Sequence, residues 1–231
     1  EAFITTLRAA HGPSDAPMAL YMFGAAAAEY QARHGMKPET FAKIPVTARR
    51  HAEHKDRAIF RKSVTVEEVL ASPTIFAPLT RLQACPPTCG AAAAILCSEA
   101  FARRHGLTEA IAITGQAMAT DFASTFEEAS AIKVVGFDLT RAAADKAYTE
   151  AGIGPGDLDV VELHDCFTAN EILTYEGLGL APIGGAEKFI EDGANTYGGQ
   201  VVTNPSGGLL AKGHPLGATG LAQCTEIVEQ L

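Results

Sequence analysis

An imidazole and a thiol stand two residues apart in the segment DVVELHDCFTANE, residues 159–171. The apolar run that ends at Leu163 predicts a strand, and His164 and Cys166 come directly after it. On an extended backbone, residues i and i+2 point to the same side, and they are separated by roughly 6.6 Å along the strand. That distance spans one reacting carbonyl group with atoms on both sides. The pair is therefore a candidate for proton transfer to, or charge stabilisation of, a carbonyl compound.

A second histidine stands in the glycine-rich passage NPSGGLLAKGHPLGATGLAQC, residues 204–224. His214 directly precedes Pro215, and proline at the first helical position is a start signal, so we expect His214 at a helix N-terminus. The helix dipole there disfavours a positive charge, and a neutral imidazole can act as a general base or polarise a carbonyl. Glycines such as Gly213 let the backbone approach a ligand closely. The passage has neither GxxxxGK[ST] nor GxGxxG spacing, so it predicts neither a P-loop nor a dinucleotide site.

The same residues also have plainer interpretations. His164 can be a hydrogen-bonded interior residue, and Cys166 can be a small buried hydrophobe. A zinc site made of both histidines and two cysteines is a further alternative. However, no CxxC or HxxxH pair anchors it, and Cys85 and Cys89 form a lone C-x3-C in a proline-rich stretch. We therefore expect no metal and no bound cofactor.

Composition and charge exclude several classes of function. The net charge of −9 argues against nonspecific binding of nucleic acid. No apolar run approaches the roughly 20 residues that a membrane-spanning helix needs, so no membrane partner is expected. The 5 cysteines are an odd number and fit reduced thiols in a cytoplasmic protein, with Cys97 and Cys224 expected to be buried and inert. One basic stretch, residues 49–62, is either a solvated helix face or a phosphate site that includes Arg49 and Arg50.

The elements that position these residues are predicted from their boundaries. Residues 18–34 indicate a helix that Gly35 ends, and Pro38 opens another that Pro45 should kink or end. Thr65 is a plausible N-cap for a short helix after it.

From residue 90 onward, strands and helices should alternate. Strands are expected at the small-residue run after Gly90, from Ala110, at 160–163 and at 201–205, and helices before Gly106, over 138–152, 168–178 and 216–231. This order predicts an α/β layered domain with a mainly parallel sheet. In open α/β sheets, ligands bind beyond the carboxyl ends of the strands, which is where both histidine segments fall.

Three motifs, in this order, resemble the thiolase superfamily: GAAAAILCSEAF at 90–101, HDCF at 164–167 and NPSGGLLAKGHPLGATG at 204–220. Most thiolases have Asn-Glu-Ala-Phe where this chain has HDCF, and the HDCF form is particular to the sterol-carrier-protein-type 3-ketoacyl-CoA thiolases. MFGAAAAEYQARHGMKPETFA, residues 22–42, resembles two further helices of that family, so the resemblance covers the whole chain. The chain departs from the family at Cys89, where an Asp or Asn is usual, and at Pro45. The resemblance implies a layered thiolase-like fold, present here in part, with helices packed on a mixed sheet.

The resemblance also implies a role for each candidate residue. His214 would deprotonate a nucleophilic cysteine and help to hold the thioester oxygen. His164 would occupy the position of the family's asparagine in that oxyanion site. Cys166 would exchange a proton with the α-carbon of the acyl-CoA, a task that suits a thiol whose pKa can be tuned toward neutrality.

Other positions would bind the substrate. Asn204, Ser206 and Gly213 would shape the pocket. The loop 83–86, which includes Ala84 and Cys85, would line the pantetheine arm of coenzyme A. Arg49 and Arg50 become candidates for its phosphates.

The resemblance further divides the chain into a loop domain at 1–84, the last strand and helix of an N-terminal half at 85–106, and an incomplete C-terminal domain at 107–231. The nucleophilic cysteine of the family would then lie upstream of residue 1, and a further oxyanion segment beyond residue 231. The implied reaction is thiolysis of a 3-ketoacyl-CoA, or its reverse, with coenzyme A as substrate. A homodimer or homotetramer is expected, located in the cytoplasm or, in a eukaryote, in the peroxisomal matrix. A retro-aldolase acting on steroid side-chain CoA esters and a noncatalytic acyl-CoA-binding subunit are the alternatives.

Overall fold

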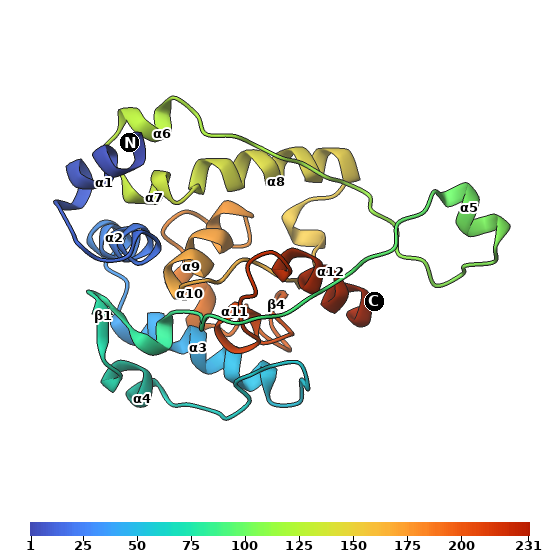
Figure 1. The fold of residues 1–231 in the computed structure, drawn as a ribbon, viewed down its shortest axis with the longest axis horizontal. Coiled ribbons are helices and arrows are strands. Elements are labelled where there is room, and N and C mark those ends of the chain that lie inside the picture. The colour runs from blue at the N-terminus through green and yellow to red at the C-terminus, as the bar shows by residue number, and fades with distance from the viewer.

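The computed structural model describes residues 1–231, and most of its regular structure is helical (Figure 1). The α-helices are α1 (Ala2–His11), α2 (Met18–His34), α3 (Pro38–Ala52), α4 (Val66–Ala71), α5 (Glu99–Arg104), α6 (Ser124–Glu127), α7 (Ala131–Val134), α8 (Phe137–Ala151), α9 (Thr168–Gly177), α10 (Ala186–Glu191), α11 (Gly208–Ala211) and α12 (Thr219–Gln230). Two short 3-10 helices complete the helical part, η1 (Arg81–Gln83) and η2 (Pro155–Asp157). None of the helices is both long enough and apolar enough to cross a membrane.

The strands are short, and they form two separate pairs. β1 (Thr74–Phe76) runs antiparallel to β2 (Leu79–Thr80), and β3 (Val160–Val161) runs parallel to β4 (Val202–Thr203). Of the predicted layered domain with a mainly parallel sheet, the structure shows one parallel pair, β3 and β4, among helices. This parallel pair matters for function because the candidate residues His164 and Asn204 follow its two strands.

The strands expected after Gly90 and from Ala110 are absent, because both segments lack a partner strand. They belong to residues 88–122, the extended arm, which leaves the body of the molecule and carries α5 at its tip (Figure 1). Apolar side chains along the arm face solvent, with Ile95 99% exposed and Met118 85% exposed. A strand is stable only when a neighbour satisfies its backbone N–H and C=O groups, so apolar sequence alone does not produce one. The helix expected before Gly106 is confirmed as α5, which Ser98 caps.

The first part of the chain folds as its local signals predict. α2 ends at Gly35, which adopts a left-handed conformation with φ 70°, and α3 begins at Pro38. Thr65 caps α4, as its backbone and side chain exchange hydrogen bonds with Glu68. However, α3 does not end at Pro45 but continues to Ala52. Burial of α3 against α4, α9, α10 and α11 outweighs the hydrogen bond that the proline removes.

The core joins the two ends of the chain across the arm. It is a single cluster of 32 buried residues, drawn from residues between 7 and 79 on one side of the arm and from residues between 131 and 211 on the other. Tyr30 of α2 donates a hydrogen bond to Glu176 of α9, and Leu209 of α11 packs in the same cluster. The division at residues 84 and 106 stays a prediction. In this structure, residues 1–84 and 123–231 share one core.

Candidate active site

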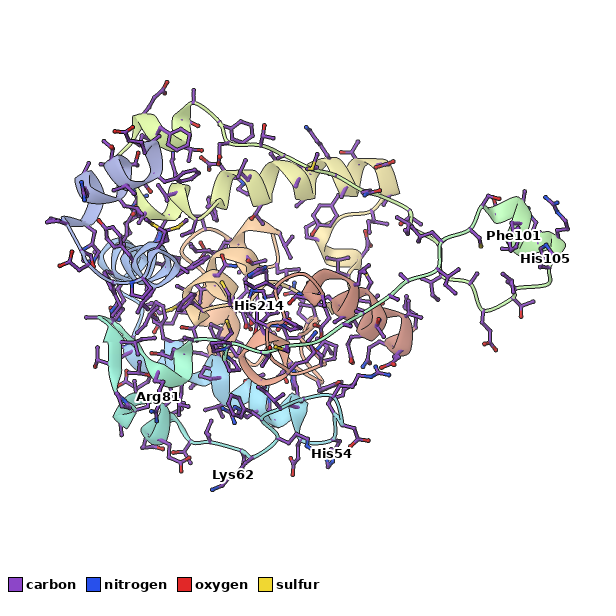
Figure 2. The ribbon with its side chains drawn as sticks, viewed as in Figure 1. His54, Lys62, Arg81, Phe101, His105 and His214 are labelled. Carbon is purple, nitrogen blue, oxygen red and sulfur yellow. The ribbon has the colours of Figure 1, made fainter.

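Two histidines from different motifs lie in contact. His164 follows β3, His214 follows α11, and their ring centroids are 4.9 Å apart with the rings nearly perpendicular. Figure 2 shows His214 near the middle of the body, whereas Phe101 and His105 lie at the tip of the arm. Burial lowers the pKa of His164, and the neighbouring His214 lowers it further. Burial also lowers the pKa of His214, with Lys212 adding to the effect. Both imidazoles are therefore neutral at pH 7, the state that a general base requires.

The local setting of His214 differs from the prediction. α12 begins at Thr219, five residues later, because Ala218 and Thr219 both donate their backbone N–H to Pro215 in a turn. Nδ1 of His214 lies 2.8 Å from the Thr219 hydroxyl, and that hydroxyl donates to the Pro215 carbonyl at 2.9 Å. Since the one hydroxyl proton is used there, Nδ1 of His214 is the donor and Nε2 carries the free lone pair. The helix dipole does not account for the neutral imidazole, but Thr219 fixes the tautomer of a base.

Cys166 lies opposite Cys85. The backbone of Cys85 donates to the Cys166 carbonyl at 2.9 Å, next to an antiparallel bridge between Ala84 and Phe167. Cys166 is buried, and burial, Cys85 and Asp165 all raise the pKa of its thiol. Burial also raises the pKa of Cys85 to about 11. The expectation that Cys166 is tuned toward neutrality is therefore wrong for this chain, in which the thiol stays protonated at pH 7.

The structure places the three main candidates in one region. His164 touches His214, and Cys166 follows His164 on the same segment. That all three side chains face one pocket stays a prediction. A cavity of about 680 Å³ has Ser206 and Lys212 in its wall but none of the three.

The cysteine exposures reverse the expected order of reactivity. Cys97 and Cys224 were expected to be buried, but both are exposed, as is Cys89. We expect brief, limiting iodoacetamide treatment of the folded 231-residue chain to label these three before Cys166, because only the thiolate reacts and the Cys166 thiolate is disfavoured. Peptide mapping measures this order, and labelling in denaturant, where all 5 thiols react, is the control. Cys166 appearing first among the labelled peptides would contradict the burial and the raised pKa.

Three of the predicted pocket residues hold the backbone in place. Asn204, at φ 49°, accepts a hydrogen bond from the Leu163 N–H at 2.9 Å and donates one to Glu171 at 3.3 Å. Ser206 donates its N–H and its hydroxyl to Glu162, at 2.8 and 2.9 Å. Gly213 has φ 109°, and a Cβ there would lie 2.9 Å from Thr88 Cγ2. The side chains of Asn204 and Ser206 are thus committed to internal hydrogen bonds, and direct contact with a substrate stays a prediction.

The basic stretch is largely neutralised. The Arg49 guanidinium is buried 4.1 Å from the ring centroid of Phe60, and Arg50 donates to Thr196 at 2.9 Å. The other pairs in the stretch are Lys55 with Glu226 at 2.5 Å, Arg57 with Glu229 at 2.6 Å and Arg61 with Asp56 at 3.1 Å. Binding of phosphate by Arg49 and Arg50 stays a prediction, and these surroundings do not favour it.

Sequence reasoning missed several residues that support the site. Thr219 orients His214, Asn170 donates to the His164 carbonyl, and Asp165 binds the start of α11. Their types gave a weak signal, since Asn and Thr near a turn often bond to the backbone. No group of three or more His, Cys, Asp or Glu side chains is arranged to hold a metal ion.

The chain is similar in sequence to several known proteins. Residues 123–231 match the family model described as Thiolase C-terminal domain-like. The chain is 52% identical to sterol carrier protein 2 of Oryctolagus cuniculus over 222 residues, covering 96% of this chain and 41% of that protein. It is 38% identical to an acetyl-CoA acetyltransferase of Methanothermobacter thermautotrophicus over 210 residues, covering 91% of this chain and 54% of that protein.

A solved structure supports the fold. The structure of the "Ltp2-ChsH2(DUF35) aldolase" has a TM-score of 0.72 at 23% identity, covering 89% of this chain and 54% of that one. The chain thus spans about half the length of the proteins that it matches, and it shows part of a thiolase-like fold. The matched model shows that residues 123–231 form a thiolase C-terminal domain-like region, and the identity near 50% to sterol carrier protein 2 extends over almost all of the chain.

Proposed function

We propose that a protein containing this chain transfers acyl groups to coenzyme A, by thiolysis of 3-ketoacyl-CoA or by the reverse condensation, in the metabolism of fatty acids or sterol side chains. The observation that carries this proposal is the pair of neutral imidazoles, His164 and His214, which lie in contact beside the Cys166 segment. The 38% identity to an acetyl-CoA acetyltransferase, over 91% of this chain, supports it.

In this proposal the three residues divide the chemistry, and His214 serves as the base and, once protonated, as an oxyanion contact. Nε2 of His214 takes the proton from a nucleophilic cysteine, which then attacks the 3-keto carbon of the substrate. His164 donates a hydrogen bond to the carbonyl oxygen on which negative charge develops. The bond between C2 and C3 breaks, and the departing carbanion of acetyl-CoA takes a proton from Cys166. The acyl group on the nucleophile then passes to the thiol of a second coenzyme A, whose proton returns to Cys166, and His214 gives its proton back to the released nucleophile.

The state of Cys166 fits the cleavage direction. Burial raises the pKa of this thiol, so it carries a proton at pH 7 and can donate it to a carbanion. The condensation direction instead requires a thiolate that removes a proton from acetyl-CoA. We therefore propose that Cys166 starts the cleavage reaction in its protonated form and acts as the acid.

The nucleophile is proposed to lie outside these 231 residues. Cys166 has the acid–base role, and one sulfur cannot hold the acyl group and transfer the proton as well. Cys85 is partly buried with a pKa of about 11, and Cys97 lies in the arm. Cys89 and Cys224 are exposed, and neither has a hydrogen bond or ring contact to His214.

The test compares the 231-residue chain with the full-length protein that contains it. Acetoacetyl-CoA and a longer 3-ketoacyl-CoA serve as substrates with coenzyme A, and loss of the magnesium–enolate absorbance reports cleavage. We expect the full-length protein to be active and the isolated chain to be inactive. Activity of the isolated chain would place the nucleophile within it.

An inactive full-length protein would sink the proposal. If it then cleaved a 3-hydroxyacyl-CoA steroid ester without added coenzyme A, it would be a retro-aldolase. If it only bound acyl-CoA, it would be a noncatalytic subunit. Sedimentation of the full-length protein would test the proposed homodimer or homotetramer.

A further inference from the structure

Asp165, between the two candidate residues of the HDCF motif, has no part in the proposed chemistry. Its side chain is completely buried, and its two oxygens accept backbone N–H groups from Leu209 at 2.7 Å and from Leu210 at 3.2 Å. These N–H groups belong to α11, a four-residue helix that ends three residues before His214. One carboxylate therefore connects the two segments that carry the histidines.

The backbone around this carboxylate is shaped to receive it. Gly207 and Gly208 both have left-handed backbone conformations, at φ 91° and 61°, which residues other than glycine rarely adopt. A Cβ on Gly208 would lie 2.7 Å from Asp165 Cγ. The two glycines thus let the chain turn closely around the acid and aim successive N–H groups at it.

Two residues before His164 also bond to the C-terminal part of the chain, but they do not replace the hydrogen bonds of Asp165 to α11. Glu162 binds Ser206, and Leu163 binds Asn204 and accepts a hydrogen bond from Gln223 at 2.6 Å. Both precede His164 and fix the approach of the segment. Asn170 and Cys85 bond to the carbonyls of His164 and Cys166, but it is the Asp165 side chain that joins this segment to α11.

We propose that Asp165 is a positioning residue that sets the placement of His164 and Cys166 relative to His214. This inference rests on the proposed function, in which the three residues act on one substrate. A carboxylate suits the task because it has two acceptor oxygens and, when ionised, no donor. An asparagine in its place offers one carbonyl oxygen and turns an NH₂ group toward the second backbone N–H. One of the two amides would then lose its acceptor, and α11 would move away from the HDCF segment.

The test is made in the full-length protein with Asp165→Asn. We expect kcat for thiolysis to fall on the order of 10²-fold with KM nearly unchanged, because a misplacement of about 1 Å costs that much in catalysis. Amide hydrogen exchange over residues 206–214 should become faster, since the Leu209 and Leu210 N–H groups lose an acceptor. The exchange measurement does not depend on activity, so it tests the connection even if the protein proves not to be a thiolase.

The matched control is Glu176→Gln, which alters a buried carboxylate that also accepts a backbone N–H, from Ala186, but joins α9 to α10. It should lose stability without the selective fall in kcat or the faster exchange at 206–214. Asp165→Asn with wild-type kcat or unchanged exchange, or an equal loss of kcat in Glu176→Gln, would overturn the inference.

If Asp165→Asn does not fold, Asp165→Ser, which leaves room for a water molecule, takes its place with the same measurements. Failure of both variants to fold, beside a folded Glu176→Gln, would reduce Asp165 to a purely structural residue and would also overturn the inference.

Discussion

Cys166→Ala in the full-length protein should abolish cleavage of 3-ketoacyl-CoA while the nucleophilic cysteine can still be acylated. In the proposed reaction the thiol of Cys166 supplies the proton for the departing carbanion, and alanine has none to give. Acylation by acetyl-CoA needs only a nucleophile, its base and an oxyanion site, so it should survive. Steady-state absorbance measures the loss of cleavage, and mass spectrometry of the intact protein detects the acyl group.

His214→Ala should behave differently, because His214 is proposed to act in both half-reactions. We expect acylation and cleavage to fall together, on the order of 10²-fold or more, since alanine removes a base and an oxyanion contact. Cys224→Ala, at an exposed thiol of α12, is the matched control and should keep wild-type activity. Equal acylation defects in the Cys166 and His214 variants would contradict the separation of their roles.

The buried acids of the site should make stability decrease as the pH rises. Burial raises the pKa of Asp165 to about 7, and burial followed by the charge of Asp165 raises the pKa of Glu171 well above its usual range. The folded state then binds more protons than the unfolded state, in which Asp titrates near 3.9, about 3 units lower. This contribution is complete below pH 4 and is lost as the pH rises through 7.

Urea unfolding of the full-length protein between pH 4.5 and 8.5 measures how the free energy of unfolding depends on pH. The double variant Asp165→Asn/Glu171→Gln should gain stability relative to wild type as the pH rises, because it has no buried acid to ionise. The lowered pKa values of His51, His164 and His214 act in the opposite direction below pH 6.5, where protonation favours unfolding, but they cancel in the difference.

Glu191→Gln is the control for this measurement. Its hydrogen bonds to Lys43 and Thr40 lower the pKa of the Glu191 carboxyl, so the wild-type residue stabilises the protein at high pH. That variant should show the opposite slope. If the difference in the free energy of unfolding between the double variant and wild type did not change with pH, the buried acids would not ionise in the folded protein between pH 4.5 and 8.5.

Local signals predicted the helices well and the sheet poorly. Gly35 and Thr65 act within one turn of the elements that they end or begin, so their effect can be read from neighbouring residues. A strand such as the one expected from Ala110 needs a partner from elsewhere, and the sequence of the segment does not show whether one is present. The prediction that Cys97 is buried was wrong for the same reason. Cysteine is usually buried, but Cys97 lies on the extended arm, which has no partner segment.

The candidate site was predictable in its members but not in its connections. The residue types and spacing pointed to His164, Cys166 and His214, and the structure brings the two histidines together. The bond from Leu209 to Asp165 joins residues 44 apart, and the tautomer of His214 depends on a hydroxyl that itself bonds to Pro215. The pKa of Cys166 depends on how many atoms cover it. Such properties arise when segments far apart in the sequence pack together, and the pattern of adjacent residues does not predict that packing.

The shared core on both sides of the arm has a consequence for biosynthesis. Lys55 pairs with Glu226, 171 residues later, and Tyr30 bonds to Glu176, 146 residues later. At ribosomal speeds of about 5–20 residues per second, α2 and α3 emerge roughly 10–30 seconds before the helices that cover them are made. During that interval the faces of α2 and α3 that will pack against α9, α10 and α11 are uncovered and remain available to chaperones. Low temperature or rare codons, which lengthen the delay, should therefore affect the yield of this chain more than that of a protein whose contacts are local.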